Sequence, residues 1–185
     1  MEKKEIRRKI KNLRLMLSEM EKESAAGDVF AQLEQMPSFI MAERICLYNS
    51  LPDELPTKSF LKKWHPRKKF FLPRVNGVNL DILPYDPEHL FSGAFDIDEP
   101  EGNEITDPDT LDLIVVPAVA YDKKGNRLGR GKGFYDRLLG STKAVTVGVA
   151  YDFQLYEELP TEPHDVPVDA VITQSATIHI NKRKF

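Results

Sequence analysis

The spacing of apolar residues at the start of the chain predicts two helices. A stripe with intervals of four, three and four residues gives one amphipathic helix from about Lys3 to Lys22. Its members are Ile6, Ile10, Leu13 and Leu17. A second apolar group indicates another helix, which we expect Pro37 to terminate. Its members are Val29, Phe30, Leu33 and Met36.

The next part of the chain alternates between strand and helix signals. Residues 44 to 49 form an apolar run that predicts a first strand. Thr57 can cap a following helix, which Pro66 ends before a strand over Lys69 to Leu72. Beyond the turn signal Asn76-Gly77, apolar and polar residues alternate. This pattern predicts a half-exposed strand that pairs with its predecessor as a hairpin.

An uninterrupted apolar run marks the middle of the expected sheet. Leu113 to Val116 is rich in β-branched residues, as expected of a central parallel strand covered on both faces. We expect further strands over Val145 to Val149 and Ala170 to Thr173, and a helix over Phe134 to Leu139. Residues 96 to 109 hold seven acids and no Lys or Arg, interrupted by proline and glycine. We therefore predict a solvated loop there.

Strands that alternate with helices indicate the fold class. We expect an α/β protein, a three-layer α/β/α sandwich with a mostly parallel, Rossmann-like central sheet. The 185 residues suit a single domain over residues 1–185. A chain of this size buries about 70% of the surface that it exposes when unfolded. In such a sheet, ligand-binding residues gather at the carboxyl ends of the strands.

Composition and charge narrow the functional classes. Lys and Arg number 26 against 29 Asp and Glu, and the resulting net charge of −3 argues against a general nucleic-acid or membrane binder. Cys46 is the single cysteine, so the chain forms no internal disulfide, which fits a reducing compartment. No apolar stretch approaches the roughly 20 residues of a spanning helix. We therefore expect a cytoplasmic protein.

The strongest chemical signal lies between Leu111 and Leu139, where an apolar run leads into a glycine-rich basic loop and then a helical pattern. The glycines are Gly125, Gly129, Gly131 and Gly133, and the cations are Lys123, Lys124, Arg127, Arg130 and Lys132. Glycines let backbone N–H groups converge on an anion, which predicts a phosphate site. The spacing fits neither a Walker A loop nor a dinucleotide motif. The alternative is a solvated connection whose glycines serve only turns.

The segment from Arg127 to Arg137 resembles the signature R-L-G-x-G-x-G-[YF]-Y-D-R of the 5-formyltetrahydrofolate cyclo-ligase family, also called methenyltetrahydrofolate synthetase. Further matches follow the family's order over nearly the whole chain. They are Lys3 and Arg7, Asp53-Glu54 with Thr57, Leu72-Pro73-Arg74, Ile97 to Pro100, and Pro163-His164-Asp165-Val166-Pro167. Asp96 departs from the pattern, because many bacterial members carry glycine there. This departure concerns the local turn and the substrate pocket rather than the ATP site.

The resemblance implies an ATP site built from the first helix and the glycine-rich loop. Its residues would be Lys3, Arg7, Arg127, Leu128, Gly129, Arg130, Gly131, Lys132, Gly133, Phe134 and Tyr135. Catalytic roles are implied for Arg130, Lys132 and Tyr135, of which the two cations would stabilise charge on the transferring phosphoryl group. Without the resemblance, the charges on the first helix would be interpreted as a solvated face.

The resemblance also implies a folate pocket and a metal site. The substrate-binding residues would be Tyr48, Glu54, Phe95, Arg130, Phe134 and Tyr135. The carboxylate of Glu54 can accept paired hydrogen bonds from a pterin ring, although a surface turn is its alternative. Asp136 and Asp165 would hold Mg²⁺, which prefers one or two carboxylates plus phosphate oxygens. Asp136 alone would also fit a helix-dipole role, and we interpret His164 as a structural turn residue.

The implied activity is an ATP- and Mg²⁺-dependent conversion of 5-formyltetrahydrofolate to 5,10-methenyltetrahydrofolate. ADP and phosphate would be released through a phosphorylated formyl intermediate. The partners would be small molecules, with no nucleic acid and no membrane, and the enzyme a monomer or weak homodimer. One alternative is a sugar-phosphate isomerase or transferase, which would need an acid/base pair and no ATP. Another is a nucleotide-sensing or RNA-binding module, which would bind without turnover and with steep salt dependence.

Overall fold

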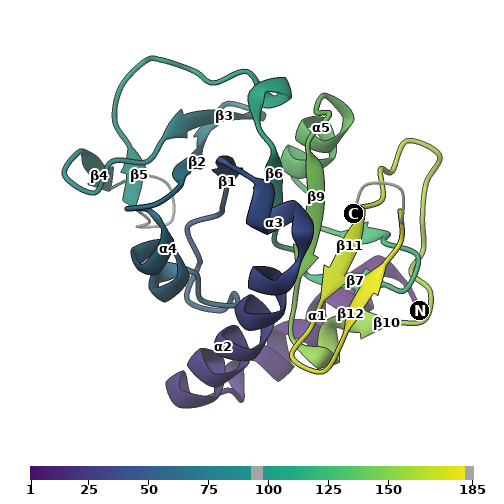
Figure 1. Ribbon diagram of the computed structural model, residues 1–185. Coiled ribbons are helices and arrows are strands. Elements are labelled where there is room, and N and C mark those ends of the chain that lie inside the picture. Colours follow the sequence, from purple (N-terminus) through teal and green to yellow (C-terminus); the bar gives the residue numbers. More distant parts are fainter. Residues whose placement is uncertain (93–97, 182–185) are drawn as a thin grey trace.

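The computed structural model describes residues 1–92 and 98–181, and a seven-stranded sheet runs through its centre (Figure 1). The strand order is β12-β11-β9-β6-β1-β2-β3. These strands are β1 (Arg44–Cys46), β2 (Lys69–Asn76), β3 (Asn79–Pro84), β6 (Leu113–Val116), β9 (Val145–Val149), β11 (Ala170–Ile172) and β12 (Thr177–His179). The five strands from β11 to β2 run parallel, and β12 and β3 pair antiparallel at the edges. The predicted mostly parallel sheet is confirmed.

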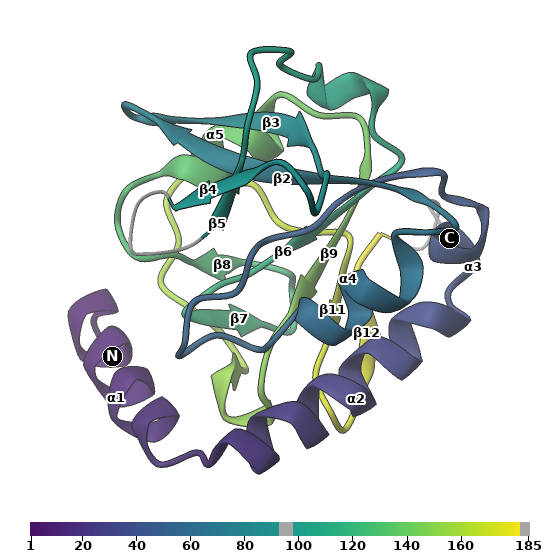
Figure 2. The same ribbon diagram turned by 90° about the vertical axis from the view of Figure 1, so that its left-hand side faces the viewer.

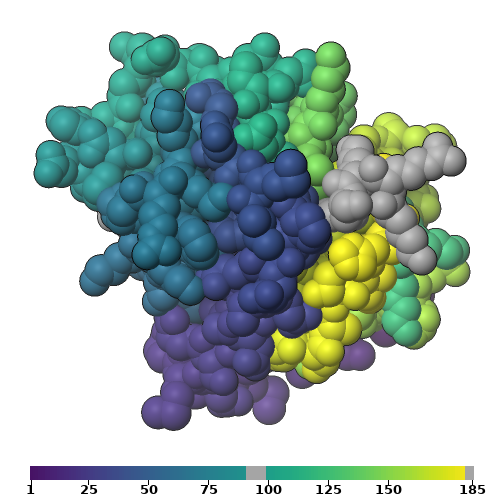
Figure 3. Space-filling model, viewed as in Figure 1, coloured from purple at the N-terminus to yellow at the C-terminus, as the bar shows by residue number. Residues whose placement is uncertain are grey.

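Helices cover both faces of this sheet, as Figure 1 and Figure 2 show from two sides. They are α1 (Lys3–Leu15), α2 (Glu19–Gln35), α3 (Pro37–Met41), α4 (Lys58–Trp64) and α5 (Phe134–Gly140), with short 3-10 helices at Pro108–Thr110 and Asp152–Gln154. In the space-filling view, the dark blue segment of α2 and α3 lies across the front between α4 and the yellow C-terminal strands (Figure 3). None of the helices in the described ranges is long and apolar enough to cross a membrane.

The central strand β6 shows why the sheet needs cover on both sides. Leu113 and Val115 pack into the core that α2, α3 and α4 share, whereas Ile114 and Val116 pack into a second core with Leu138 of α5. All four residues of the strand are buried. Successive side chains of a strand point to opposite faces, so a continuous apolar run requires helices on both. The three-layer α/β/α arrangement that the sequence predicted is therefore confirmed.

A smaller sheet positions the first helix. It contains β7 (Ala120–Asp122), β8 (Arg127–Leu128) and β10 (Leu155–Tyr156). Ile6 and Ile10 of α1 are buried against Ala120 and Leu128 of this sheet. This contact places α1 beside the glycine-rich segment that follows β8. Separately, β4 (Leu90–Ser92) pairs antiparallel with β5 (Asp98–Pro100).

The single helix predicted from Lys3 to Lys22 is wrong, because the chain breaks into α1 and α2. The Ser18 hydroxyl accepts a hydrogen bond from the Glu21 amide at 3.1 Å, and the Glu21 carboxylate accepts one from the Ser18 amide at 3.2 Å. This reciprocal pair starts a new helix at Glu19. The predicted apolar stripe continued across the break, so periodicity alone did not reveal it.

The predictions for Thr57 and for the acidic loop need correction, and one helix was not predicted. Thr57 precedes α4, but its hydroxyl donates to the Tyr48 carbonyl at 2.9 Å instead of capping the helix. Pro37 follows the end of α2 as predicted, and it also begins the unpredicted helix α3. Within the predicted acidic loop, Asp98–Pro100 forms β5. The hairpin of β2 and β3 is confirmed, with Gly77 of its turn at φ +62°.

Candidate active site

One cavity of about 760 Å³ collects the predicted site residues. Its lining contains Lys3 and Arg7 from α1, Tyr48 and Glu54 from the segment after β1, all residues from 127 to 136, and Asp165. Every predicted site residue that the structure describes is among them. Phe95 lies outside the described residues. The segment after β1 leaves the carboxyl end of a parallel strand, where an α/β sheet is expected to bind ligands.

The glycine-rich segment takes a shape that only glycine adopts freely. Gly131 and Gly133 have φ values of +98° and +73°, in the left-handed region. A Cβ added at Gly133 would lie 2.7 Å from Nη1 of Arg137. Arg137 also donates through Nη2 to the Lys132 carbonyl at 2.8 Å, which holds the segment against the start of α5. The loop therefore borders the cavity in a fixed form and is not a simple solvated turn.

Arg7 ties α1 to this loop. Its Nε donates to the Gly129 carbonyl at 2.9 Å. Lys3, one helical turn earlier, lies 3.3 Å from Oε1 of Glu162. Both cations line the cavity, so the charged face of α1 points at it. Both side chains therefore have contacts beyond solvent, which favours the predicted role of this face in the site.

The other cations differ in how firmly they are held. Arg127 is nearly buried, with 8% of its side chain exposed, and its Nε donates to the Pro117 carbonyl at 2.9 Å. Its guanidinium lies 4.9 Å from the centre of the Tyr135 ring. Arg130 donates to Asp53 at 2.8 Å. The Lys132 side chain is exposed, and its ammonium makes no hydrogen bond or ion pair within residues 1–92 and 98–181, so it is available to an anion.

Glu54 is held at the cavity wall by its own loop. Its Oε1 accepts a hydrogen bond from the Leu51 amide at 2.8 Å, and its carbonyl oxygen accepts one from the Tyr151 hydroxyl at 3.3 Å. Lys22 donates to the Pro52 carbonyl at 2.9 Å and anchors the loop to α2. Burial raises the pKa of the Glu54 carboxyl. The fixed carboxylate can accept hydrogen bonds from a ligand.

Two tyrosines add an aromatic wall. Burial raises the pKa of Tyr48 and of Tyr135 well above their usual range, so both phenols stay neutral. The Tyr48 hydroxyl already donates to the Leu55 carbonyl at 2.7 Å. Tyr48 therefore offers a ligand its ring rather than its hydroxyl. Tyr135 lies against Arg127, which fixes its ring.

The predicted metal ligands border the same cavity in different surroundings. Asp136 lies 4.0 Å from Nη1 of Arg127. Asp165 accepts a hydrogen bond from the Glu162 amide at 2.8 Å and shares a tight group with Glu162 and His164. One ligand atom from each residue of that group lies within 4.8 Å of the others. The carboxylate oxygens of Asp136, Asp165 and Glu162 are the hard donors that Mg²⁺ prefers, so the residues fit this ion.

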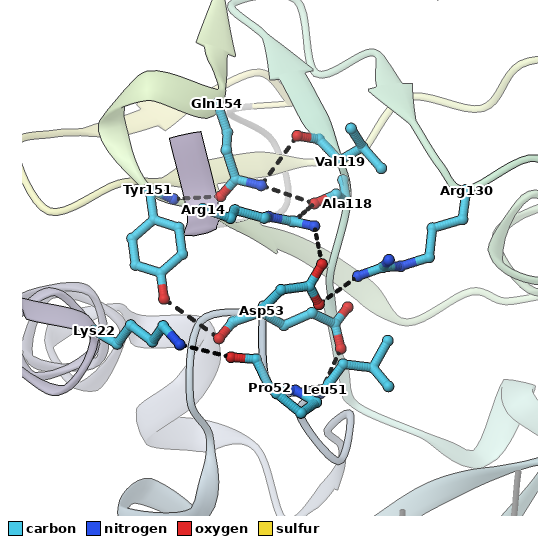
Figure 4. Close-up of polar contacts among 11 residues, drawn as sticks. Arg14, Lys22, Leu51, Pro52, Asp53, Ala118, Val119, Arg130, Tyr151 and Gln154 are labelled. Carbon is cyan, nitrogen blue, oxygen red and sulfur yellow. Dashed lines mark hydrogen bonds and ion pairs between the residues drawn. The ribbon is translucent and has the colours of Figure 1, made fainter. Parts of the chain in front are cut away.

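Sequence reasoning missed several residues of this region. Glu99 of β5 lines the cavity with only 9% of its surface exposed, although its segment was predicted to be a solvated loop. Glu162 belongs to the acidic group but was assigned no role. Arg14 and Asp53 do not line the cavity, but they contact each other and the lining residues Ala118 and Arg130 (Figure 4). Arg14 lies on the face of α1 that carries Lys3 and Arg7, and this spacing was the available signal.

Comparisons with known proteins agree on one family. The model of the 5-formyltetrahydrofolate cyclo-ligase family matches residues 1–174. The 5-formyltetrahydrofolate cyclo-ligase of Escherichia coli K12 is 32% identical over 176 residues, which cover 90% of this chain and 97% of the relative. The Haemophilus influenzae protein of the same name is 35% identical over 89% of this chain and 93% of its own. The solved structure of Aquifex aeolicus 5,10-methenyltetrahydrofolate synthetase is 37% identical and superposes with a TM-score of 0.88, covering 97% of this chain and 93% of its own.

Proposed function

We propose that this chain, which belongs to the 5-formyltetrahydrofolate cyclo-ligase family, converts 5-formyltetrahydrofolate to 5,10-methenyltetrahydrofolate with ATP and Mg²⁺. ADP and phosphate are the other products. The observation that carries the proposal is that one cavity is lined by cations from α1 and the glycine-rich loop together with the Glu54 carboxylate and aromatic side chains. Such a cavity can hold a triphosphate and a pterin side by side.

The chemical difficulty lies in the formyl group. Its carbon is a poor electrophile, because the amide nitrogen N5 donates electron density to it. In the proposed reaction the formyl oxygen attacks the γ-phosphorus of ATP, and the bond to ADP breaks. The product is a phosphorylated imine. N10 then attacks its carbon and gives up its proton to solvent or to the departing phosphate. The carbon–oxygen bond breaks, and phosphate leaves with the former formyl oxygen as the ring closes.

This reaction asks the protein for positioning and charge stabilisation rather than for a covalent nucleophile. Lys132, whose ammonium has no partner in the described residues, would neutralise charge on the transferring phosphoryl group. Arg130 would assist it from the neighbouring loop position. Lys3 and Arg7 would hold the phosphates from the side of α1.

The folate would occupy the part of the cavity that carries Glu54 and the aromatic residues. The Glu54 carboxylate would accept N–H donors of the pterin ring, which fixes its orientation. Tyr48 and Phe134 would contact its faces, and Tyr135 would help to position the formyl group. Phe95 remains a predicted contact.

A metal ion would complete the charge balance. Asp136 and Asp165 would hold Mg²⁺, with Glu162 close enough to Asp165 to take part. Bound there, the ion would reduce the repulsion between phosphate oxygens and the attacking formyl oxygen. The neighbouring Arg127, with Nη1 4.0 Å from Oδ1 of Asp136, would help to orient that carboxylate.

An assay with purified protein tests the proposal. The absorbance of methenyltetrahydrofolate should rise when 5-formyltetrahydrofolate, ATP and Mg²⁺ are all present, and it should stay flat when ATP or Mg²⁺ is omitted. Turnover without ATP would reject the ligase mechanism. Binding of nucleotide without any turnover would favour the nucleotide-sensing alternative instead.

A further inference from the structure

Arg14 is a buried cation that donates to the carbonyl oxygen of Ala118, a residue that lines the cavity (Figure 4). It belongs to the last turn of α1, and only 4% of its surface is exposed. Nη2 donates to the Ala118 carbonyl at 2.7 Å, and Nη1 lies 3.3 Å from Oδ2 of Asp53. Its Nε is buried without a hydrogen-bond partner in the part of the chain that the structure describes. A buried guanidinium needs an anionic partner, and Asp53 supplies it.

Asp53 is shared between Arg14 and a second arginine. Its Oδ1 accepts a hydrogen bond from Nη2 of Arg130 at 2.8 Å, while Oδ2 faces Arg14. One carboxylate thus joins a buried guanidinium to one that lines the cavity and is 46% exposed. Although burial opposes ionisation, the two arginines lower the pKa of Asp53. The carboxylate is therefore charged at neutral pH and can hold both partners.

The acceptor of Arg14 is itself fixed. The Gln154 side-chain amide donates to the Ala118 carbonyl and to the Val119 carbonyl, each at 3.0 Å. Its Oε1 accepts a hydrogen bond from the Tyr151 amide at 2.7 Å. These bonds hold the backbone at Ala118 and Val119 in place, so the carbonyl that accepts from Arg14 is fixed (Figure 4). Within residues 1–92 and 98–181, the half-exposed Arg130 side chain makes no hydrogen bond or ion pair except with Asp53.

We propose that Arg14 is a positioning residue that acts through Asp53 on Arg130. By fixing the Asp53 carboxylate, it keeps the Arg130 guanidinium in one orientation at the cavity. Neither Arg14 nor Asp53 lines the cavity, and their effect on the reaction is therefore indirect. The inference rests on the proposed function in one respect, which is the contact of Arg130 with the nucleotide.

A purely structural ion pair is the competing explanation. Buried ion pairs are weak evidence for stability, because desolvation opposes the attraction between the charges. Stability measurements alone would not separate the two explanations. A double-mutant cycle on catalysis does, because it measures whether Arg14 needs Arg130 in order to affect turnover.

The cycle compares kcat/KM for ATP in the wild type, Arg14→Met, Arg130→Ala and the double variant, with melting temperatures recorded for each. Arg14→Met should lower kcat/KM between about tenfold and about 100-fold through misplacement of a catalytic group. In the Arg130→Ala background, Arg14→Met should lower kcat/KM for ATP by less than about twofold. Arg14→Lys should recover part of the loss, since it keeps the charge but not the fork of two donors.

Two further variants keep the test decisive. Arg8 is exposed on the same helix, so Arg8→Met should leave kcat/KM unchanged. If Arg14→Met does not fold, Asp53→Asn takes its place in the cycle with the same expectation. Losses that multiply in the double variant would overturn the inference and leave the proposed function intact. An unchanged kcat/KM in Arg130→Ala would instead contradict the assigned role of Arg130, and the inference with it.

Discussion

The Nε of Arg7 donates to the carbonyl oxygen of Gly129 at 2.9 Å, across 122 positions of sequence. This bond joins the first helix to the glycine-rich loop. It therefore fixes the position of the two cationic parts of the cavity relative to each other. The N-terminal helix is therefore part of the site and not an appendage.

Replacement of Arg7 by alanine should weaken ATP binding. Loss of one charge-assisted contact of about 1.4 kcal/mol corresponds to a rise of about tenfold in KM for ATP. The KM for 5-formyltetrahydrofolate should change much less. Steady-state kinetics with each substrate varied in turn measures both, and Arg8→Ala is the matched control on the exposed face of the helix. Equal rises in both KM values would argue for general disruption.

Lys132 should matter for the rate and not for stability. Its side chain is exposed and unpaired in the described residues, so Lys132→Ala removes no packing. If the ammonium stabilises charge in the transition state, kcat should fall by about 100-fold to 1,000-fold. Thermal unfolding should be unchanged. A matching drop in the melting temperature would assign Lys132 to structure.

Asp136→Asn should shift the metal requirement. The amide keeps the shape of the side chain but removes the charge that would attract Mg²⁺. Titration of activity with Mg²⁺ should show a half-saturating concentration at least about tenfold higher, and Asp165→Asn should act in the same direction. Identical titration curves for the wild type and both variants would place the ion elsewhere.

The left-handed glycine of the loop allows a matched comparison of stability. Gly133→Ala places a Cβ at φ +73° and 2.7 Å from Arg137, so it should lower the free energy of unfolding by about 1–2 kcal/mol. Gly140→Ala, at the end of the same helix, meets no atom within 4 Å and should be neutral or stabilising. Denaturant unfolding of both variants measures the difference. Equal effects would mean that the loop tolerates a side chain.

The ionised Glu54 carboxylate should lower the free energy of unfolding, although it contributes to binding of 5-formyltetrahydrofolate. Burial raises its pKa above the ordinary 4.5, so the folded state holds the proton more tightly than the unfolded state. Stability is therefore lost as the pH rises from 4.5 to the folded pKa, and above that pKa the cost of the charge stays at its full value. Glu54→Gln should melt at a higher temperature than the wild type at pH 7, and the gap should close as the pH falls below 4.5. Its KM for 5-formyltetrahydrofolate should rise. A variant less stable than the wild type at pH 7 would refute this.

The sequence predicted the sheet well because its strands are marked by strong local signals. The run Leu113 to Val116 and the hairpin turn at Asn76-Gly77 both specify their structure within a few residues. The break at Ser18 was missed because the same apolar stripe spans both helices. The loop prediction failed at β5, because pairing with β4 depends on a distant partner.

The sequence predicted those residues of the candidate site that lie in recognisable sequence motifs. The glycine-rich segment and the pairs Lys3 with Arg7 and Asp136 with Asp165 all reach one cavity. Their chemical roles remain predictions. Arg14 was missed because its importance comes from burial and from a contact with Asp53, 39 positions away, which no local pattern records.

The most direct test follows the formyl oxygen. 5-Formyltetrahydrofolate labelled with ¹⁸O in its formyl group is turned over once with ATP and Mg²⁺, and the released phosphate is examined by mass spectrometry. If the cavity brings the formyl oxygen onto the γ-phosphate, one ¹⁸O atom should appear in each phosphate. Phosphate without the label, formed together with methenyltetrahydrofolate, would contradict the account.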